Sequence, residues 1–187
     1  MAILPYPEMS DLSDEVRAHF ERFAADHGRP SLLRWMLGWS PSASEAMEGL
    51  YHPIFASAKL DRRLKELLFV AASEQRQCFY CMGGHSRFLV NEYGYDRDDV
   101  ERMRRGEAVE QMDPAEHALV MLIRRAATDG EPVTPDDIAA VRAHGWDDDS
   151  IVEALSAGTQ AHFTNTFAQA VRLEDDIEPS EGPDGYF

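Results

Sequence analysis

Apolar side chains recur every three or four residues through most of this chain, a spacing that places them along one face of an α-helix. No segment shows the sustained alternation of apolar and polar residues that is typical of a β-strand. We therefore expect an all-α fold. The clearest helical segments are residues 13–28, 61–75, 114–130, 134–145 and 148–174.

Two parts of the chain repeat one another, because residues 85–103 align with residues 136–154. Each copy predicts a helix that ends in a glycine turn, then an aromatic residue, then an aspartate that caps the next helix. Gly38 marks a weaker third instance of this turn. The aligned turn residues are Gly94 with Gly145, Tyr95 with Trp146, and Asp96 with Asp147.

The repeat predicts a helical bundle built from two related helix-turn-helix halves. The first half carries both cysteines, whereas the second has Asp129, Pro132 and Asp136 at the positions of Cys78, Cys81 and His85, so we expect it to support the site without chemistry of its own. The expected organisation is an N-terminal helical arm (1–30), the cysteine-bearing half (31–110), the second half (111–177) and a mobile acidic tail (178–187).

Net charge limits the partners of this chain. With 34 acidic against 18 basic side chains and a formal net charge of -16, it is poorly suited to nucleic acid or to an anionic membrane surface. The N-terminus has no basic segment followed by an apolar run of signal-peptide length, and no apolar run reaches eighteen residues. We expect a soluble, cytoplasmic protein in which two cysteines serve chemistry rather than a disulfide scaffold.

The two cysteines form a CxxC motif with a histidine one turn further on. On a helix starting at Cys78, Cys81 lies roughly 60° and His85 roughly 20° from Cys78, so the three side chains can meet. Cys78 lies where unpaired backbone N–H groups favour a thiolate, and Arg76 adds positive charge. Gly84, with the glycine before it, weakens the helix, which indicates that a substrate or another backbone comes close.

Glu66 opens a segment that is apolar on nearly all sides and therefore predicts a helix within the core. A carboxylate there is costly without a partner, which suits Glu66 to the role of a proton shuttle. The alternative is that Glu66 pairs with Arg62, Arg63 or another base at the surface. The side chains expected on the same side as Glu66 are Phe69, Val70 and Ser73; those expected opposite are Leu64, Leu67, Leu68 and Ala71.

The spacing of Glu66, Cys78, Cys81 and His85 resembles the E-x11-CxxC-x3-H signature of the alkylhydroperoxidase D (AhpD)-like proteins of the carboxymuconolactone decarboxylase superfamily. The resemblance extends over about residues 31–173. It implies an all-α homo-oligomer, from dimer to trimer or hexamer, whose cysteines cycle between dithiol and disulfide. It also implies a hydroperoxide substrate, a thiol electron donor or peroxiredoxin partner, and a proton relay through glutamate and histidine, without a bound cofactor.

Tyr80 departs from the founding members of that family, which have a second histidine immediately before the second cysteine. Tyrosine donates a hydrogen bond but is a poor base at neutral pH. The resemblance therefore supports thiol redox chemistry more firmly than a particular peroxidase rate or partner. The helix-end position favours Cys78 as the first nucleophile, whereas the spacing to His85 favours Cys81.

Two other interpretations remain open from the sequence. Cys78, Cys81 and His85 could hold zinc with Glu66 or water as the fourth ligand, although the chain has no second pair of cysteines. The chain could also be a non-catalytic structural oligomer of the same superfamily. The expectation adopted here is a redox site without a metal.

Overall fold

Helices account for most of the chain that the structure describes, which in this computed structural model is residues 2–173 without the side chains of residues 26 and 27. These residues contain no β-strand, which confirms the all-α prediction. The predicted acidic tail at 178–187 lies outside the described residues. The elements are η1 (Met9–Asp11), α1 (Asp14–His27), α2 (Leu32–Leu37), α3 (Pro41–Ala56), α4 (Arg62–Gln75), α5 (Phe79–Tyr93), α6 (Arg97–Arg104), α7 (Pro114–Ala127), α8 (Pro135–Ala143) and α9 (Asp148–Val171).

Local signals in the sequence set the ends of these helices. The Ser13 hydroxyl accepts a hydrogen bond from the Val16 N–H at the start of α1, and Gly28 ends that helix with φ of 77°. Thr134 caps α8 in the same way. Because such side chains satisfy backbone N–H groups that a helix leaves unpaired, the expected starts of α1 and α8 are confirmed.

The glycine turn that repeats in the sequence also repeats in the structure. Gly94 and Gly145 have φ of 69° and 93°, and Asp96 and Asp147 then cap α6 and α9. Gly38 differs, because its φ is -59° and it continues the right-handed conformation of α2. The weaker third instance is therefore not the same turn, and the boundaries of the two halves stay a prediction.

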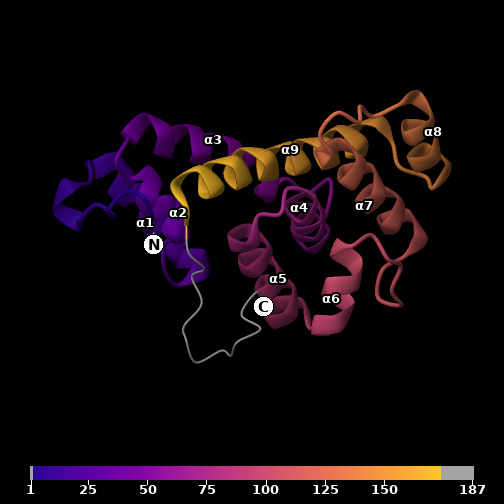
Figure 1. Cartoon of the computed structure of the whole chain (residues 1–187), viewed down its shortest axis with the longest axis horizontal. Helices are drawn as coiled ribbons and strands as arrows, with labels where there is room; N and C mark the ends of the chain where they lie inside the picture. The colour runs from indigo at the N-terminus through magenta and orange to yellow at the C-terminus, as the bar shows by residue number, and fades with distance from the viewer. Residues whose placement is uncertain (1, 174–187) are drawn as a thin grey trace.

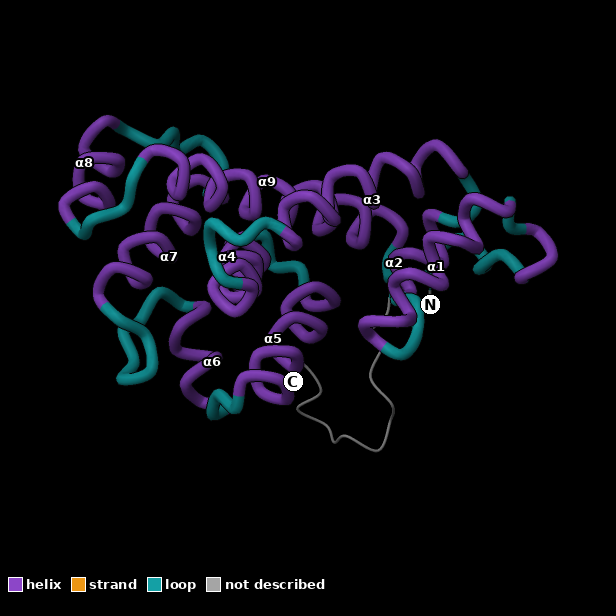
Figure 2. The backbone as a smooth tube through the Cα atoms, turned by 180° about the vertical axis from the view of Figure 1, so that it is seen from behind, coloured by secondary structure: helices purple, strands orange, loops and turns teal. Residues whose placement is uncertain are grey.

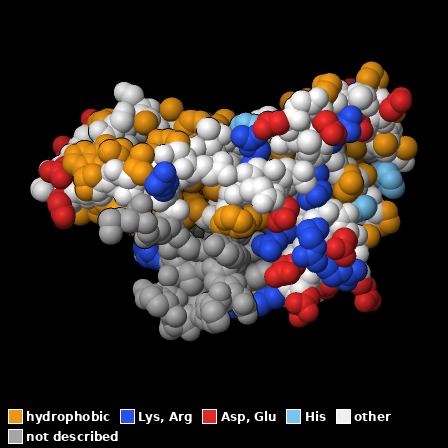
Figure 3. Space-filling model, in the orientation of Figure 1, with side chains coloured by type: hydrophobic (Ala, Val, Ile, Leu, Met, Phe, Trp, Pro, Cys, Tyr) orange, Lys and Arg blue, Asp and Glu red, His pale blue; other side chains and the backbone are white. Residues whose placement is uncertain are grey.

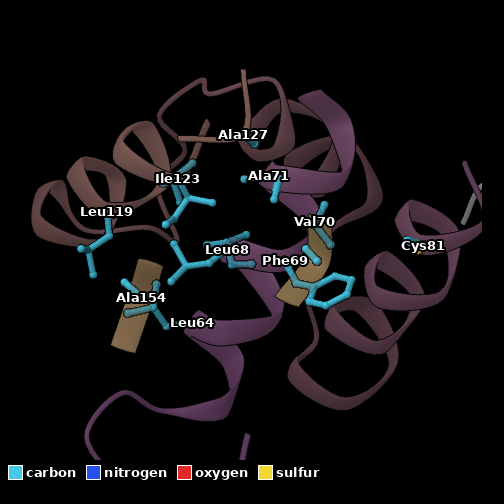
Figure 4. Close-up of a cluster of buried hydrophobic side chains, with 14 of the residues drawn as sticks. Leu64, Leu68, Phe69, Val70, Ala71, Cys81, Leu119, Ile123, Ala127 and Ala154 are labelled. Carbon is cyan, nitrogen blue, oxygen red and sulfur yellow. The ribbon is translucent and has the colours of Figure 1, made fainter. Parts of the chain in front are cut away.

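Helix α4 is the centre of the fold. It packs against α5, α6, α7 and α9, and Figure 1 shows it nearly end-on with these helices around it, an arrangement that Figure 2 shows from behind. Every residue from Leu64 to Ser73 is buried. Leu68 lies beside Leu119 and Ile123 of α7, whereas Phe69 and Val70 point to the opposite side (Figure 4), as the helical spacing predicts. Polar side chains on α4 must therefore find partners inside the protein.

Lys65 shows how this requirement fixes the position of α4. Its side chain is fully buried, and its ammonium group lies 2.9 Å from Glu153 of α9 while donating to the Ser57 carbonyl at 2.6 Å. Glu153 also accepts hydrogen bonds from the Ser57 hydroxyl and the Leu60 N–H. One buried ion pair therefore joins α4, α9 and the connection that precedes α4.

The N-terminal helices pack on one side of this arrangement, where α1 and α2 contact α3 and α3 contacts α9. Leu12, Val16 and Phe20 form a small separate core against Trp35. In Figure 3, basic and acidic side chains are interleaved over α6, as in the ion pair between Arg102 and Asp99. None of the helices in residues 2–173 has the length and apolar character needed to cross a membrane.

The buried ion pair predicts a pH-dependent stability. Burial acts to raise the pKa of Glu153, but hydrogen bonds from Ser57 and Lys65 outweigh it and hold the pKa below its usual value. The stabilisation is therefore present above the unfolded-state pKa of about 4.3 and is lost as the pH falls through the folded-state pKa. Glu153→Gln should lower the free energy of unfolding at pH 7 by about 3 kcal/mol, since it leaves Lys65 buried without its anion.

Urea denaturation at several pH values measures both effects. The wild type should lose stability more steeply than Glu153→Gln between about pH 5 and pH 3. Glu131→Gln is the matched control, because its exposed pair with Arg125 should contribute less than about 1 kcal/mol. Equal losses in the two variants would contradict the account of the buried pair.

Candidate active site

The two cysteines lie at the start of α5, directly after α4 ends. Gln77 adopts a positive φ of 52°, and the Cys78 N–H donates to the Ser73 carbonyl at 3.1 Å, which turns the chain back along α4. Cys78 is the N-cap of α5 and Cys81 lies in its first turn. Both are free thiols and both are buried, with exposed fractions of 1% and 4%.

The two thiols shift one another's pKa in opposite directions. The Cys81 thiol donates a hydrogen bond to Cys78, and this bond, assisted by the Cys81 N–H, lowers the pKa of Cys78 against the opposing effect of burial. Burial raises the pKa of Cys81 well above its ordinary value, and the hydrogen bond and charge of Cys78 raise it further. A hydrogen bond with Thr164 of α9 acts in the other direction. The first proton to leave the pair is therefore that of Cys78.

Glu66 and His85 form an acid–imidazole pair between α4 and α5, in which the carboxylate is buried and the imidazole is half-buried. Glu66 is 2% exposed, and its Oε2 lies 2.5 Å from Nδ1 of His85. The His85 ring stacks on Phe69 with ring centroids 3.8 Å apart. Glu66 Oε1 also accepts a hydrogen bond from Nε of Arg62 at 3.3 Å. The expected partnership with His85 and the alternative pairing with Arg62 thus both occur, at a carboxylate that is buried rather than at the surface.

A cavity of about 190 Å³ brings most of the predicted site residues together. Cys81, Glu66, His85, Tyr80 and Gly84 all line it, whereas Cys78 is not one of its lining residues. Most of the wall is apolar or aromatic. The other lining residues are Phe23, Ser31, Leu33, Arg34, Met47, Tyr51, Arg62, Phe69, Arg87, Phe88 and Thr164.

The three remaining predicted residues have different surroundings. The Tyr80 hydroxyl accepts a hydrogen bond from the Leu33 N–H at 3.0 Å, which joins α5 to α2. A Cβ added to Gly84 would meet no atom within 4 Å, so this glycine borders open space in the cavity instead of another backbone. Arg76 forms an ion pair with Asp129 at 2.6 Å and does not line the cavity.

The described residues contain no group of three or more histidine, cysteine and acidic side chains arranged to hold a metal ion. In particular, the Glu66 oxygens are already engaged by His85 and Arg62. The zinc interpretation would use Cys78, Cys81, His85 and Glu66 as ligands. In the structure Glu66 and His85 are hydrogen-bonded to each other, and both cysteines are free thiols.

Sequence reasoning missed the part of the cavity formed by the N-terminal helices and α9. Arg34 of α2, Tyr51 of α3 and Thr164 of α9 are distant from the CxxC motif in the sequence, and no spacing rule places them beside it. One signal was present: Arg34 is the only charged residue in the apolar stretch of α2. A lone charge on a buried helix indicates a specific partner or a ligand.

Comparisons with known proteins agree with this architecture. Residues 41–125 match the carboxymuconolactone decarboxylase family. Among solved structures, an uncharacterised peroxidase-related protein from Ralstonia eutropha JMP134, described as an alkylhydroperoxidase AhpD core, is 18% identical, with a TM-score of 0.84 over 94% of this chain and 92% of that one. A peroxidase-related protein from Silicibacter sp. TM1040 is 19% identical, with a TM-score of 0.80 over 99% and 94%.

A cysteine-to-alanine variant of the debrominase Bmp8, solved in complex with 2,3,4-tribromopyrrole, is 16% identical, with a TM-score of 0.83 over the full length of both chains. No curated protein matches this chain. At these identities the structural similarity establishes the fold. The chain therefore contains a carboxymuconolactone decarboxylase family domain at residues 41–125 and folds as an all-helical AhpD-like protein.

Proposed function

We propose that this protein is a thiol-dependent reductase of small, largely apolar hydroperoxides. The observation that carries the proposal is that one cavity is lined by the Cys81 thiol and by the hydrogen-bonded pair of Glu66 and His85. A cavity of about 150 Å³ suffices for benzene in another protein, so a cavity of about 190 Å³ accommodates a small organic molecule. Its aromatic walls favour an apolar body.

Cys81 is the proposed nucleophile, because it lines the cavity and Cys78 does not. Because Cys78 has the lower pKa, it is the thiolate of the pair, and it accepts the proton of Cys81 through the hydrogen bond between them as Cys81 attacks. The sulfur attacks the terminal peroxide oxygen, the O–O bond breaks, and the departing alkoxide takes a proton from His85, which Glu66 orients. The products are an alcohol and a sulfenic acid on Cys81.

Cys78 then resolves the sulfenic acid. Its sulfur attacks the Cys81 sulfur, the S–O bond breaks, and the leaving hydroxide takes the Cys78 proton to form water. The hydroperoxide has gained two electrons, and the dithiol has become a disulfide. A second turnover requires an external thiol donor or a peroxiredoxin-type partner to reduce this disulfide by exchange.

Reductive dehalogenation is a second candidate, favoured by the aromatic walls of the cavity around Phe69, Phe88 and Tyr51. The structurally similar Bmp8 is a debrominase. The same two thiols supply the two electrons needed to replace a carbon–bromine bond by carbon–hydrogen, with release of bromide and formation of the disulfide. Bromide release from a brominated pyrrole, measured beside peroxide consumption, distinguishes the two activities.

Counting free thiols after one equivalent of cumene hydroperoxide tests the proposed function. The wild type should lose both thiols per hydroperoxide consumed. Cys78→Ser should lose its remaining thiol and stop at a sulfenic acid on Cys81, which dimedone traps and mass spectrometry locates. Cys81→Ser should react at least about a hundredfold more slowly, because Cys78 does not reach the cavity. Rapid oxidation of Cys78 in Cys81→Ser would reverse the assigned order, and inert thiols in the wild type would refute the function.

The pKa shifts predict two well-separated thiol titrations. Absorbance at 240 nm, which reports thiolate, should rise by one thiolate per chain below the ordinary cysteine pKa of about 8.5, and the second thiolate should form only far above it. Cys81→Ser retains a hydroxyl donor to Cys78 and should keep the low-pH step. Cys81→Ala lacks that donor, so its step should move to higher pH. Identical titrations of the two variants would disprove the role given to the hydrogen bond.

A further inference from the structure

Arg34 lies in the wall of the cavity but has no part in the proposed proton transfers. Its side chain is 6% exposed, and its Nε donates to Oε1 of Glu48 at 2.8 Å. The guanidinium carbon lies 3.5 Å from the centre of the Phe23 ring and 4.8 Å from that of Tyr51. Because the ion pair and the two aromatic rings hold the planar group, its remaining N–H donors have a fixed direction.

One of these donors is unsatisfied. Nη2 of Arg34 is buried and has no hydrogen-bond partner among the residues that the structure describes. A buried donor of a charged group is costly to leave unpaired, and native proteins rarely do so without a reason. Arg34 also lines the cavity that contains Cys81, so a molecule in that cavity lies against the same side chain.

The charges around the cavity indicate the kind of acceptor. Arg34, Arg62 and Arg87 line it, whereas Glu66 is the only acidic side chain among the described residues of its lining, and Glu66 is engaged by Arg62 and His85. Glu48, which lies outside the lining, offsets part of the charge of Arg34, but the lining itself is cationic in a chain whose formal net charge is -16. A carboxylate accepts charge-assisted hydrogen bonds from a guanidinium with matching planar geometry.

We propose that Arg34 is a specificity-determining residue that binds an anionic group, most simply a carboxylate, at the end of the substrate remote from its reacting bond. The inference rests on the proposed function for the identity of that bond. The substrate class is then a small hydroperoxide with an apolar body and one acidic group. The body lies along the aromatic wall, and the peroxide lies at Cys81.

The test compares two hydroperoxides that differ only in charge: cumene hydroperoxide and its 4-carboxylate derivative. The wild type should oxidise its thiols about tenfold to a hundredfold faster with the carboxylate at limiting substrate, the range expected for one charge-assisted hydrogen bond. Arg34→Lys keeps the charge but loses the planar donor pair. It should reduce that preference about tenfold, and Arg34→Met combined with Glu48→Gln should abolish it.

Arg142→Gln is the charge-matched control, because Arg142 pairs with Asp148 on the exposed surface of α8 and α9. It should leave both rates and their ratio unchanged. Equal rates of the wild type with the two hydroperoxides, or a preference that survives in both Arg34 variants, would overturn the inference. If the Arg34 variants fail to fold by circular dichroism, the wild-type comparison alone decides.

Calorimetric titration of the wild type with 4-isopropylbenzoate, which carries no peroxide, separates this inference from the proposed function. Binding that weakens about tenfold or more in Arg34→Lys supports the anionic subsite even if no hydroperoxide oxidises the thiols, in which case the proposed function alone fails. The opposite result is also distinguishable. If cumene hydroperoxide oxidises the thiols, but the carboxylate derivative reacts no faster and 4-isopropylbenzoate does not bind, the proposed function stands and the Arg34 inference fails.

Discussion

The burial of α4 on all sides is the constraint on which the rest of the structure depends. A helix surrounded by α5, α6, α7 and α9 exposes none of its central residues to water, so each polar group on it needs a partner within the protein. Lys65 meets this requirement with Glu153, and Glu66 meets it with His85 and Arg62. The first pair fixes the helix in place, and the second places a carboxylate and an imidazole beside two thiols.

The position of α5 follows from the same constraint. The turn at Gln77 reverses the chain so that α5 lies along α4, which brings His85 against Phe69 and Glu66. The thiols then occupy the end of α5 that is nearest the reversal, where Cys78 receives the hydrogen bond of Cys81. The proposed roles of the two cysteines rest on this geometry: the hydrogen bond from Cys81 lowers the pKa of Cys78, and Cys81 lines the cavity.

The sequence predicted the parts of this structure that depend on local signals. Helix periodicity and caps such as Ser13 and Thr134 determined the all-α fold and the helix starts, because capping is decided within one turn. The periodicity of a helix also predicted correctly that Glu66 lies on the same side of α4 as Phe69. The depth of its burial, and the joint pairing with Arg62 and His85, depend on tertiary packing that no local pattern encodes.

The cavity was the least predictable feature. Its walls come from α1 to α5 and α9, and Arg34 of α2 lines it while the neighbouring Trp35 packs against Leu12, Val16 and Phe20. Tyr80 shows what a motif alone cannot predict. Its spacing identified it as part of the CxxC motif, but only the structure shows that its hydroxyl accepts a hydrogen bond from the Leu33 N–H and so holds α2 against α5. The Gly38 turn failed as a third repeat because its φ is ordinary for a helix.

The central claim is that Glu66 and His85 act together to protonate the alkoxide that departs when Cys81 attacks the hydroperoxide. A double-mutant cycle tests it most directly, with the rate of thiol loss to cumene hydroperoxide measured in Glu66→Gln, His85→Ala and the combined variant. Because general acid–base catalysis contributes about a hundredfold or more, each single variant should slow the reaction by about that factor, and the combined variant should be no slower than either. Wild-type rates in either single variant, or losses that multiply in the combined one, would contradict the account.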